Sequence, residues 1–164
     1  MESGILNAKM PHPKESMVEK GACQVPFFKF EMGETQLDDI RTHLKIDQTL
    51  CGKPIQMADG KSKVALVTTP AMGADETGLV HGGFVFGLAD YAAMLAVNHP
   101  NVVLASAEVK FLQPTKVGDT LRAIATVMRA KGKKKTVEVI VKKGDISVLS
   151  GNFTCFVLEK HVLS

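Results

Sequence analysis

The segment that decides the fold reads HGGFVFGLADYAAMLAV and runs from His81 to Val97. From Phe84 onward it is apolar on nearly every side, and its Leu, Met and Ala residues favour a helix. A helix that is apolar all round is buried on most of its faces. The segment therefore predicts one central buried helix, which starts near His81-Gly82-Gly83 and stops at Asn98-His99-Pro100-Asn101.

Strand-like segments lie on both sides of this helix, joined by short turns that indicate antiparallel neighbours. Strands are expected at Leu44–Leu50, Lys63–Thr69, Val102–Gln113, Thr120–Arg129, Thr136–Lys142 and Ile146–Leu158. In the first strand after the helix, alternation predicts an apolar face made of Val103, Ala105, Ala107, Val109 and Phe111. One apolar helix and one curved antiparallel sheet predict an α+β domain whose sheet wraps around the helix.

The first 35 residues differ from the rest, because Met10-Pro11-His12-Pro13-Lys14 holds two prolines and no apolar period. We expect an N-terminal extension over residues 1–35, with a short helix near residues 35–42, and a single domain over 36–164. No secretory signal is visible, and no segment approaches the roughly 18 apolar residues of a membrane span.

Composition argues against several classes of protein. The net charge of +3 is too small to indicate a nucleic-acid partner, and without Trp an aromatic base-stacking surface is not expected. Cys23, Cys51 and Cys155 are widely spaced and form no CxxC pair. They indicate the reduced thiols of a cytoplasmic protein and no metal site.

Asp90 is the only carboxylate between Gly82 and Val97. Burying an unpaired carboxylate is costly, so an apolar helix that keeps one usually gives it a partner or a chemical task. Either Asp90 caps a loop or pairs with Lys or Arg, or it takes part in catalysis.

Gly82 and Gly83 let another backbone or a ligand come close to the start of the helix. Free N–H groups there favour a developing negative charge and can form an oxyanion hole. A plain flexible turn is the alternative. Gly82 and Asp90 are eight residues apart, or about 12 Å along one helix, too far for one carbonyl to contact both. A shared bond therefore requires two antiparallel helices across a two-fold axis, in a homodimer or a dimer of dimers.

The block from His81 to Asp90 resembles the hotdog-fold acyl-CoA thioesterases, most closely the phenylacetyl-CoA and 4-hydroxybenzoyl-CoA thioesterase branch. The runs Val109–Pro114 and Gly118–Leu121 are similar to that family's third strand and the turn after it. The resemblance covers roughly residues 40–160. It implies a hotdog fold and hydrolysis of an acyl-CoA to the free acid and CoA, with CoA as part of the substrate and no other cofactor.

The resemblance also implies a role for each matched residue. Asp90 would be the general base or nucleophile, the Gly82 N–H would polarise the carbonyl, and His81 would shape the turn and position the acyl group. Met94 stands where some members place a polar residue one turn after the acid, so no side chain is assigned to the water. The residues expected to contact substrate are Gly83, Phe84 and Met94.

The phosphates of CoA call for basic residues near the cleft. Lys131, Lys133, Lys134 and Lys135 form a basic cluster beside Arg129, and Lys110 and Lys116 are further candidates. A solvated hairpin tip is the alternative interpretation of the cluster.

Two other functions suit a hotdog domain. Some members bind acyl-CoA without hydrolysing it, as ligand sensors of transcription regulators. Here no helix-turn-helix signal precedes residue 40, and Asp90 would have no chemical task. The hydratases and dehydratases need a His and an acid at spacings that are absent here.

Overall fold

The structure, a computed structural model, describes residues 37–164. The predicted extension over 1–35 and its boundary at residue 36 lie outside the described residues. The elements, in chain order, are η1 (Leu37–Asp39), α1 (Gln48–Cys51), β1 (Lys53–Ala58), β2 (Lys61–Val67), η2 (Pro70–Met72), α2 (Gly82–Val97), β3 (Val102–Phe111), β4 (Thr120–Lys131), β5 (Lys134–Lys143) and β6 (Ile146–Val157). None of the helices in 37–164 is long and apolar enough to cross a membrane.

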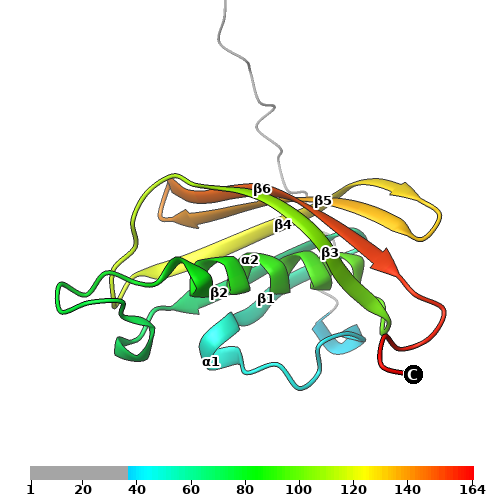
Figure 1. Cartoon of the computed structure of the whole chain (residues 1–164), viewed down its shortest axis with the longest axis horizontal. Coiled ribbons are helices and arrows are strands. Elements are labelled where there is room, and N and C mark those ends of the chain that lie inside the picture. The colour runs from blue at the N-terminus through cyan, green and yellow to red at the C-terminus, as the bar shows by residue number, and fades with distance from the viewer. Residues whose placement is uncertain (1–36) are drawn as a thin grey trace, which may run out of the picture. The chain divides into compact units, whose positions relative to one another are not determined.

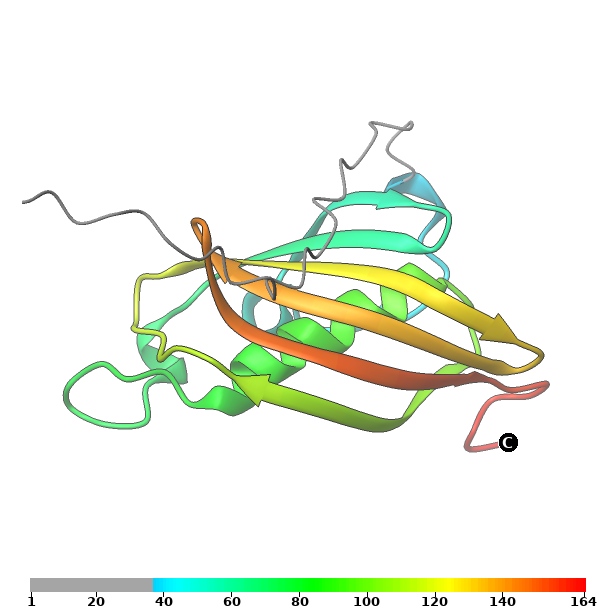
Figure 2. The same cartoon turned by 90° about the horizontal axis from the view of Figure 1, so that it is seen from above.

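Six antiparallel strands form one sheet in the order β1-β2-β4-β5-β6-β3. Helix α2 lies along one face of this sheet, which curves around it (Figure 1). The view in Figure 2 shows β1 and β3 at the two edges of the sheet, with α2 behind the strands. The predicted α+β architecture, a curved antiparallel sheet on one helix, is confirmed.

Helix α2 is held against the sheet by burial along most of its length. Its buried residues are Val85, Leu88, Ala89, Tyr91, Ala92, Ala93, Met94, Leu95 and Ala96. Four of these nine residues are alanine, which lets the strands approach the helix closely at those positions. Where the hydroxyl of buried Ser62 on β2 meets the helix, it donates a 2.7 Å hydrogen bond to the Ala92 carbonyl, so this polar contact costs no unpaired group.

The strand predicted at Leu44–Leu50 is wrong. Most of this segment forms turns and the first residues of α1, and the first strand of the sheet starts at Lys53 instead. The cause is local: the Asp47 carboxylate accepts from both the N–H and the hydroxyl of Thr49, which caps a helical turn. Side-chain bonds of this kind compete with a strand ladder.

The prediction of which β3 residues share the apolar face is partly wrong, because the strand contains a β-bulge. The pairing of β3 with β6 shifts between Leu104 and Ser106. Because the bulge adds one residue, side chains before it change sides. Ala107, Val109 and Phe111 share the face of buried Phe153, as predicted, but Leu104 takes the place expected for Val103.

The glycine between α1 and β1 gives a test of the fold. Gly52 has a φ of +94°, and an added Cβ would lie 2.8 Å from Ala65 O, Leu88 Cδ1 and Val64 Cγ1. Gly118 has a similar φ of +91° with nothing within 4 Å. Gly52→Ala should lower the free energy of unfolding by about 3 kcal/mol or more, against about 1 kcal/mol for Gly118→Ala. Equal losses in urea denaturation would contradict this packing.

Candidate active site

The first turn of α2 is shaped by His81 and the two glycines after it. His81 is the N-cap, and its Nδ1 accepts a 3.0 Å hydrogen bond from the Gly83 N–H. A Cβ at residue 83 would lie 2.8 Å from this Nδ1, so the cap requires glycine there. A neutral His81 ring must then carry its proton on Nε2.

The backbone N–H of Gly82, unlike that of Gly83, is not used within this first turn. As the first helical residue it has no acceptor within the helix, and its N–H makes no hydrogen bond within residues 37–164. Phe111, at the end of β3, packs directly on Gly82: a Cβ there would lie 3.0 Å from its ring. A free N–H at the positive end of a sixteen-residue helix is suited to an anionic oxygen.

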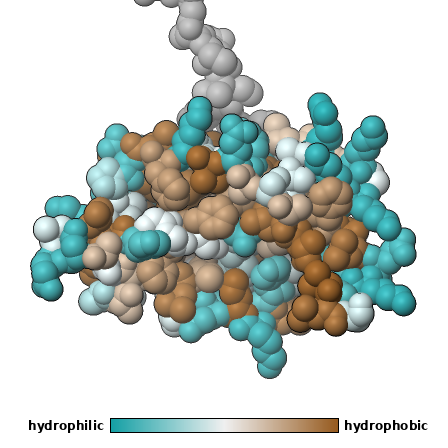
Figure 3. Space-filling model, viewed as in Figure 1, coloured by the Kyte–Doolittle hydropathy of each residue, from teal (hydrophilic) through white to brown (hydrophobic). Residues whose placement is uncertain are grey.

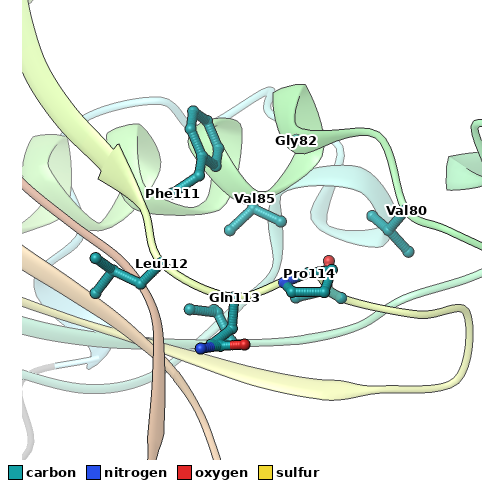
Figure 4. Close-up of a pocket in the computed structure, with 9 residues that line it drawn as sticks. Val80, Gly82, Val85, Phe111, Leu112, Gln113 and Pro114 are labelled. Carbon is teal, nitrogen blue, oxygen red and sulfur yellow. The ribbon is translucent and has the colours of Figure 1, made fainter.

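A mostly apolar cavity of about 300 Å³ opens beside this N–H. In Figure 4, Val85 points from the first turn of α2 toward the segment that follows β3, and the Phe111 ring stands next to the helix. The lining residues are Val80, Gly82, Val85, Phe111, Leu112, Gln113, Pro114, Thr115 and Val148. An apolar group attached to a polarised carbonyl fits this surface.

Asp90 lies two turns further along α2 and is half-buried. Its Oδ1 is inaccessible to solvent and has no hydrogen-bond partner among the described residues. Burial raises the pKa of this carboxyl from 3.8 to about 6. A carboxylate that is ionised at neutral pH but basic enough to take a proton is suited to general-base catalysis.

Two thiols lie near enough to feel this charge. Burial and the Asp90 charge together raise the pKa of Cys155 to about 12. Burial, and then the charges of Asp47 and Asp90, raise the pKa of Cys51. Both side chains therefore stay protonated at neutral pH, so neither is a candidate nucleophile.

A second cavity, of about 350 Å³, lies at the other end of α2. The β4–β5 hairpin, the end of β6 and the residues after the helix surround it. The lining residues are Arg41, Val97, Asn98, His99, Gly132, Lys133, Lys135 and Val157. Its charged residues are all basic, in contrast to the apolar cavity beside Gly82.

The model of the thioesterase superfamily matches residues 77–150, which include all of α2, strands β3 to β5 and the first residues of β6. A crystal structure of an uncharacterized protein, PH1136 from Pyrococcus horikoshii, is 57% identical and covers 76% of this chain and 96% of that one, with a TM-score of 0.76. The chain belongs to the hotdog-fold thioesterase superfamily. The Escherichia coli PaaI protein of the phenylacetic acid degradation operon is 25% identical, with a TM-score of 0.64, over 70% of this chain and 84% of that one.

Curated relatives with other names are similar to a large part of this chain. The methylthioribose-1-phosphate isomerase of Aquifex aeolicus is 57% identical over 122 residues, 74% of this chain and 27% of that protein. The transcription factor FapR of Caldanaerobacter subterraneus is 31% identical over 113 residues, 68% of this chain and 56% of that protein. The chain thus spans about a quarter to somewhat over half of these relatives, and their names describe the longer proteins.

Within this thioesterase-superfamily domain, three predicted contact residues of α2 do not line the apolar cavity. Met94 is 1% exposed in the core, so it has no access to a solvent-borne substrate. The Gly83 N–H is already used by His81. The Phe84 ring packs edge-on against the His81 ring, with centroids 6.3 Å apart.

The basic residues divide by the face of the sheet they occupy. Lys110, Arg129 and Lys134 alternate with inward-facing neighbours and so point away from α2, whereas Lys133 lines the second cavity. Lys135, another member of the predicted basic cluster, also lines it. The alternation that predicts Val137, Val139 and Val141 on the inner face extends back to Lys135 and puts it on the same face.

The burial of Asp90 has a measurable effect on stability. Since its pKa is higher in the folded than in the unfolded chain, folded protein loses stability as pH rises from about 4 to about 6. Asp90→Asn removes this loss, on the order of 2 to 3 kcal/mol at about 1.4 kcal/mol per pKa unit. Relative to wild type, the variant should therefore gain more stability at pH 8 than at pH 4 in urea denaturation.

Asp59, in the exposed β1–β2 turn, supplies the control for this comparison. Asp59→Asn removes one surface carboxylate and should show no such gain. The same gain in both variants, or none in Asp90→Asn, would contradict a desolvated Asp90.

Proposed function

We propose that this protein hydrolyses an acyl-CoA thioester in a site shared between two subunits. The observation that carries the proposal is the solvent-inaccessible Oδ1 of Asp90, which has no hydrogen-bond partner within residues 37–164. It lies on the same helix as the Gly82 N–H, which also has no acceptor in that range. The chain's match to the thioesterase superfamily points to hydrolysis of a thioester. This reaction needs both a base and an oxyanion donor, which the two groups can supply.

The two groups cannot serve one substrate within a single chain. Helix α2 runs without a break from Gly82 to Val97, so Gly82 and Asp90 are about 12 Å apart along its axis. An antiparallel α2 from a second copy brings Gly82 of one subunit to Asp90 of the other. The symmetry then gives two equivalent sites per dimer.

The edge strand β3 is suited to this pairing. It bonds to β6 on one side only, and residues 105–108 in its middle are exposed. Long exposed edges of this kind favour pairing with another chain. Figure 3 shows apolar residues gathered across the middle of the face on which β3 and α2 lie in Figure 1.

Contacts within the chain support one position for the proposed two-fold axis. Phe86 is midway between Gly82 and Asp90, and its ring stacks on Phe153 with centroids 5.7 Å apart. Phe153 in turn pairs with Ala107 on β3. An axis that passes the helices near Phe86 therefore passes the sheet edge near Ala107, where two copies of β3 can pair antiparallel.

The reaction follows from these positions. The Gly82 N–H donates to the carbonyl oxygen as it becomes an oxyanion, while the partner's Asp90 carboxylate takes a proton from water. The water oxygen bonds to the carbonyl carbon, the C–S bond breaks, and the CoA thiolate receives the proton. If an Asp90 oxygen instead attacks the carbonyl carbon directly, the C–S bond breaks and the acyl group is held as a mixed anhydride with Asp90. Water then hydrolyses this anhydride to the free acid. The cavity beside Gly82 holds the apolar part of the substrate next to the carbonyl.

The similarity to PaaI supports an aromatic or related acyl group, and the phenylacetyl-CoA branch stays a prediction. Assembly beyond the dimer and a cytoplasmic location also stay predictions. The similarity to FapR favours one second candidate, an acyl-CoA-binding domain without turnover. That candidate leaves the buried Asp90 carboxylate without a task.

Thiol release from a panel of short, aromatic and long acyl-CoAs tests the proposal. Asp90→Asn should fold and dimerise but lose about 10²- to 10⁴-fold in rate. In the wild type, kcat/KM should rise with pH and level off, with a midpoint near pH 6, because the carboxylate must be ionised to accept a proton.

Asp59→Asn should keep the wild-type rate in the same assay. An Asp90→Asn protein that hydrolyses thioesters at the wild-type rate would contradict the proposal. Tight binding of acyl-CoA by the wild type without any thiol release would favour the ligand-binding candidate instead.

A further inference from the structure

The basic cavity at the far end of α2 has no part in the chemistry described so far. Lys135 makes no ion pair within residues 37–164, whereas the Lys133 ammonium lies 2.7 Å from Glu159 and the Arg41 guanidinium 3.6 Å from Asp39. The two ion pairs are well exposed and contribute little. The cavity therefore keeps a net positive charge.

The spacing of residues along α2 and, independently, along β6 indicates that this cavity lies in line with Asp90. Val97, which lines the cavity, is seven residues after Asp90, so it lies on the same face of α2 about 10 Å further along. On β6, Val157 lines the cavity and is two residues after Cys155, which feels the Asp90 charge. Helix α2 and strand β6 therefore both run from the neighbourhood of the Asp90 carboxylate toward the basic residues of the cavity.

The lysines reach the same side of the sheet. Lys135 pairs directly with buried Cys155, so its side chain leaves the sheet on the face that carries α2. Lys133 is held beside it, because its carbonyl accepts a 2.8 Å hydrogen bond from the Val157 N–H. His99 Nδ1 accepts from the Asn101 N–H at 3.0 Å, which leaves Nε2 as a further donor.

We propose that this cavity binds the phosphates at the nucleotide end of CoA, in the subunit that supplies Asp90. The inference rests on the proposed function. The pantetheine arm between the thioester sulfur and the first phosphate matches about four extended residues, roughly 14 Å. An arm of that length can span the distance of about 10 Å along α2 from Asp90 to Val97, which lines the cavity.

The same length decides which subunit provides the cavity. From Gly82 to the cavity of its own chain is about 22 Å along α2, beyond the reach of the arm. The cavity of the Asp90 subunit is the one within reach. Each substrate therefore contacts Gly82 of one subunit and, in the other, first Asp90 and then Lys135.

A double substitution, Lys133→Ala with Lys135→Ala, tests the assignment. Loss of two charged contacts to phosphate should weaken binding of CoA at least tenfold in calorimetry. The KM for acyl-CoA should rise by a similar factor with kcat nearly unchanged. The KM for the matching acyl-N-acetylcysteamine thioester, which has no phosphate, should not change.

The matched control is Lys131→Ala with Lys142→Ala, which removes the same charge from residues that do not line the cavity. Equal CoA affinity in the two double variants, or no binding of CoA to the wild type, would overturn the inference. Because calorimetry with CoA needs no turnover, failure of the proposed hydrolysis would show up separately, in the thiol-release assay alone.

Discussion

Burial of the apolar helix α2 against the sheet holds the domain together, and it also fixes what the domain can do. The helix contributes nine buried residues to one continuous core with the strands. Water is excluded from that contact, so a carboxylate on the helix is expensive to ionise and correspondingly basic. Asp90 is that carboxylate. Under the proposed function, its cost to stability is tolerated because the site needs a proton acceptor there.

Most of the fold could be predicted from the sequence because one helix dominates it. An apolar segment with a single charge could only be central, and alternation located the strands around it. The failures were local. Asp47 capped a helical turn where an imperfect alternation suggested a strand, and a bulge before Ser106 reversed the sides of the residues ahead of it. Neither a side-chain cap nor a bulge changes the hydrophobic pattern that such a prediction uses.

The candidate site could be predicted as far as it lies on α2. Asp90 stood out as the single carboxylate of an apolar helix and Gly82 as a glycine at its start, and the family resemblance supplied their expected roles. If both act on one bond, their separation along one helix requires a second subunit. Contact residues were harder, because they depend on which way a side chain points across several strands. Met94 looked available but packs in the core, and Lys135 looked like part of a solvated hairpin but faces the helix.

The shared site is tested most directly by combining two inactive subunits. Gly82→Pro removes the donor N–H, and proline suits this position because it is the first of the helix and His81 before it is extended, with ψ 126°. Gly82→Ala adds the same Cβ against Phe111 but keeps the N–H, so it should stay active. Heterodimers of Gly82→Pro and Asp90→Asn, isolated through two different affinity tags, hold one intact site of two and should show about half the wild-type rate of thiol release. Inactive heterodimers, formed in good yield from these two subunits, would contradict a site built from Gly82 of one chain and Asp90 of the other.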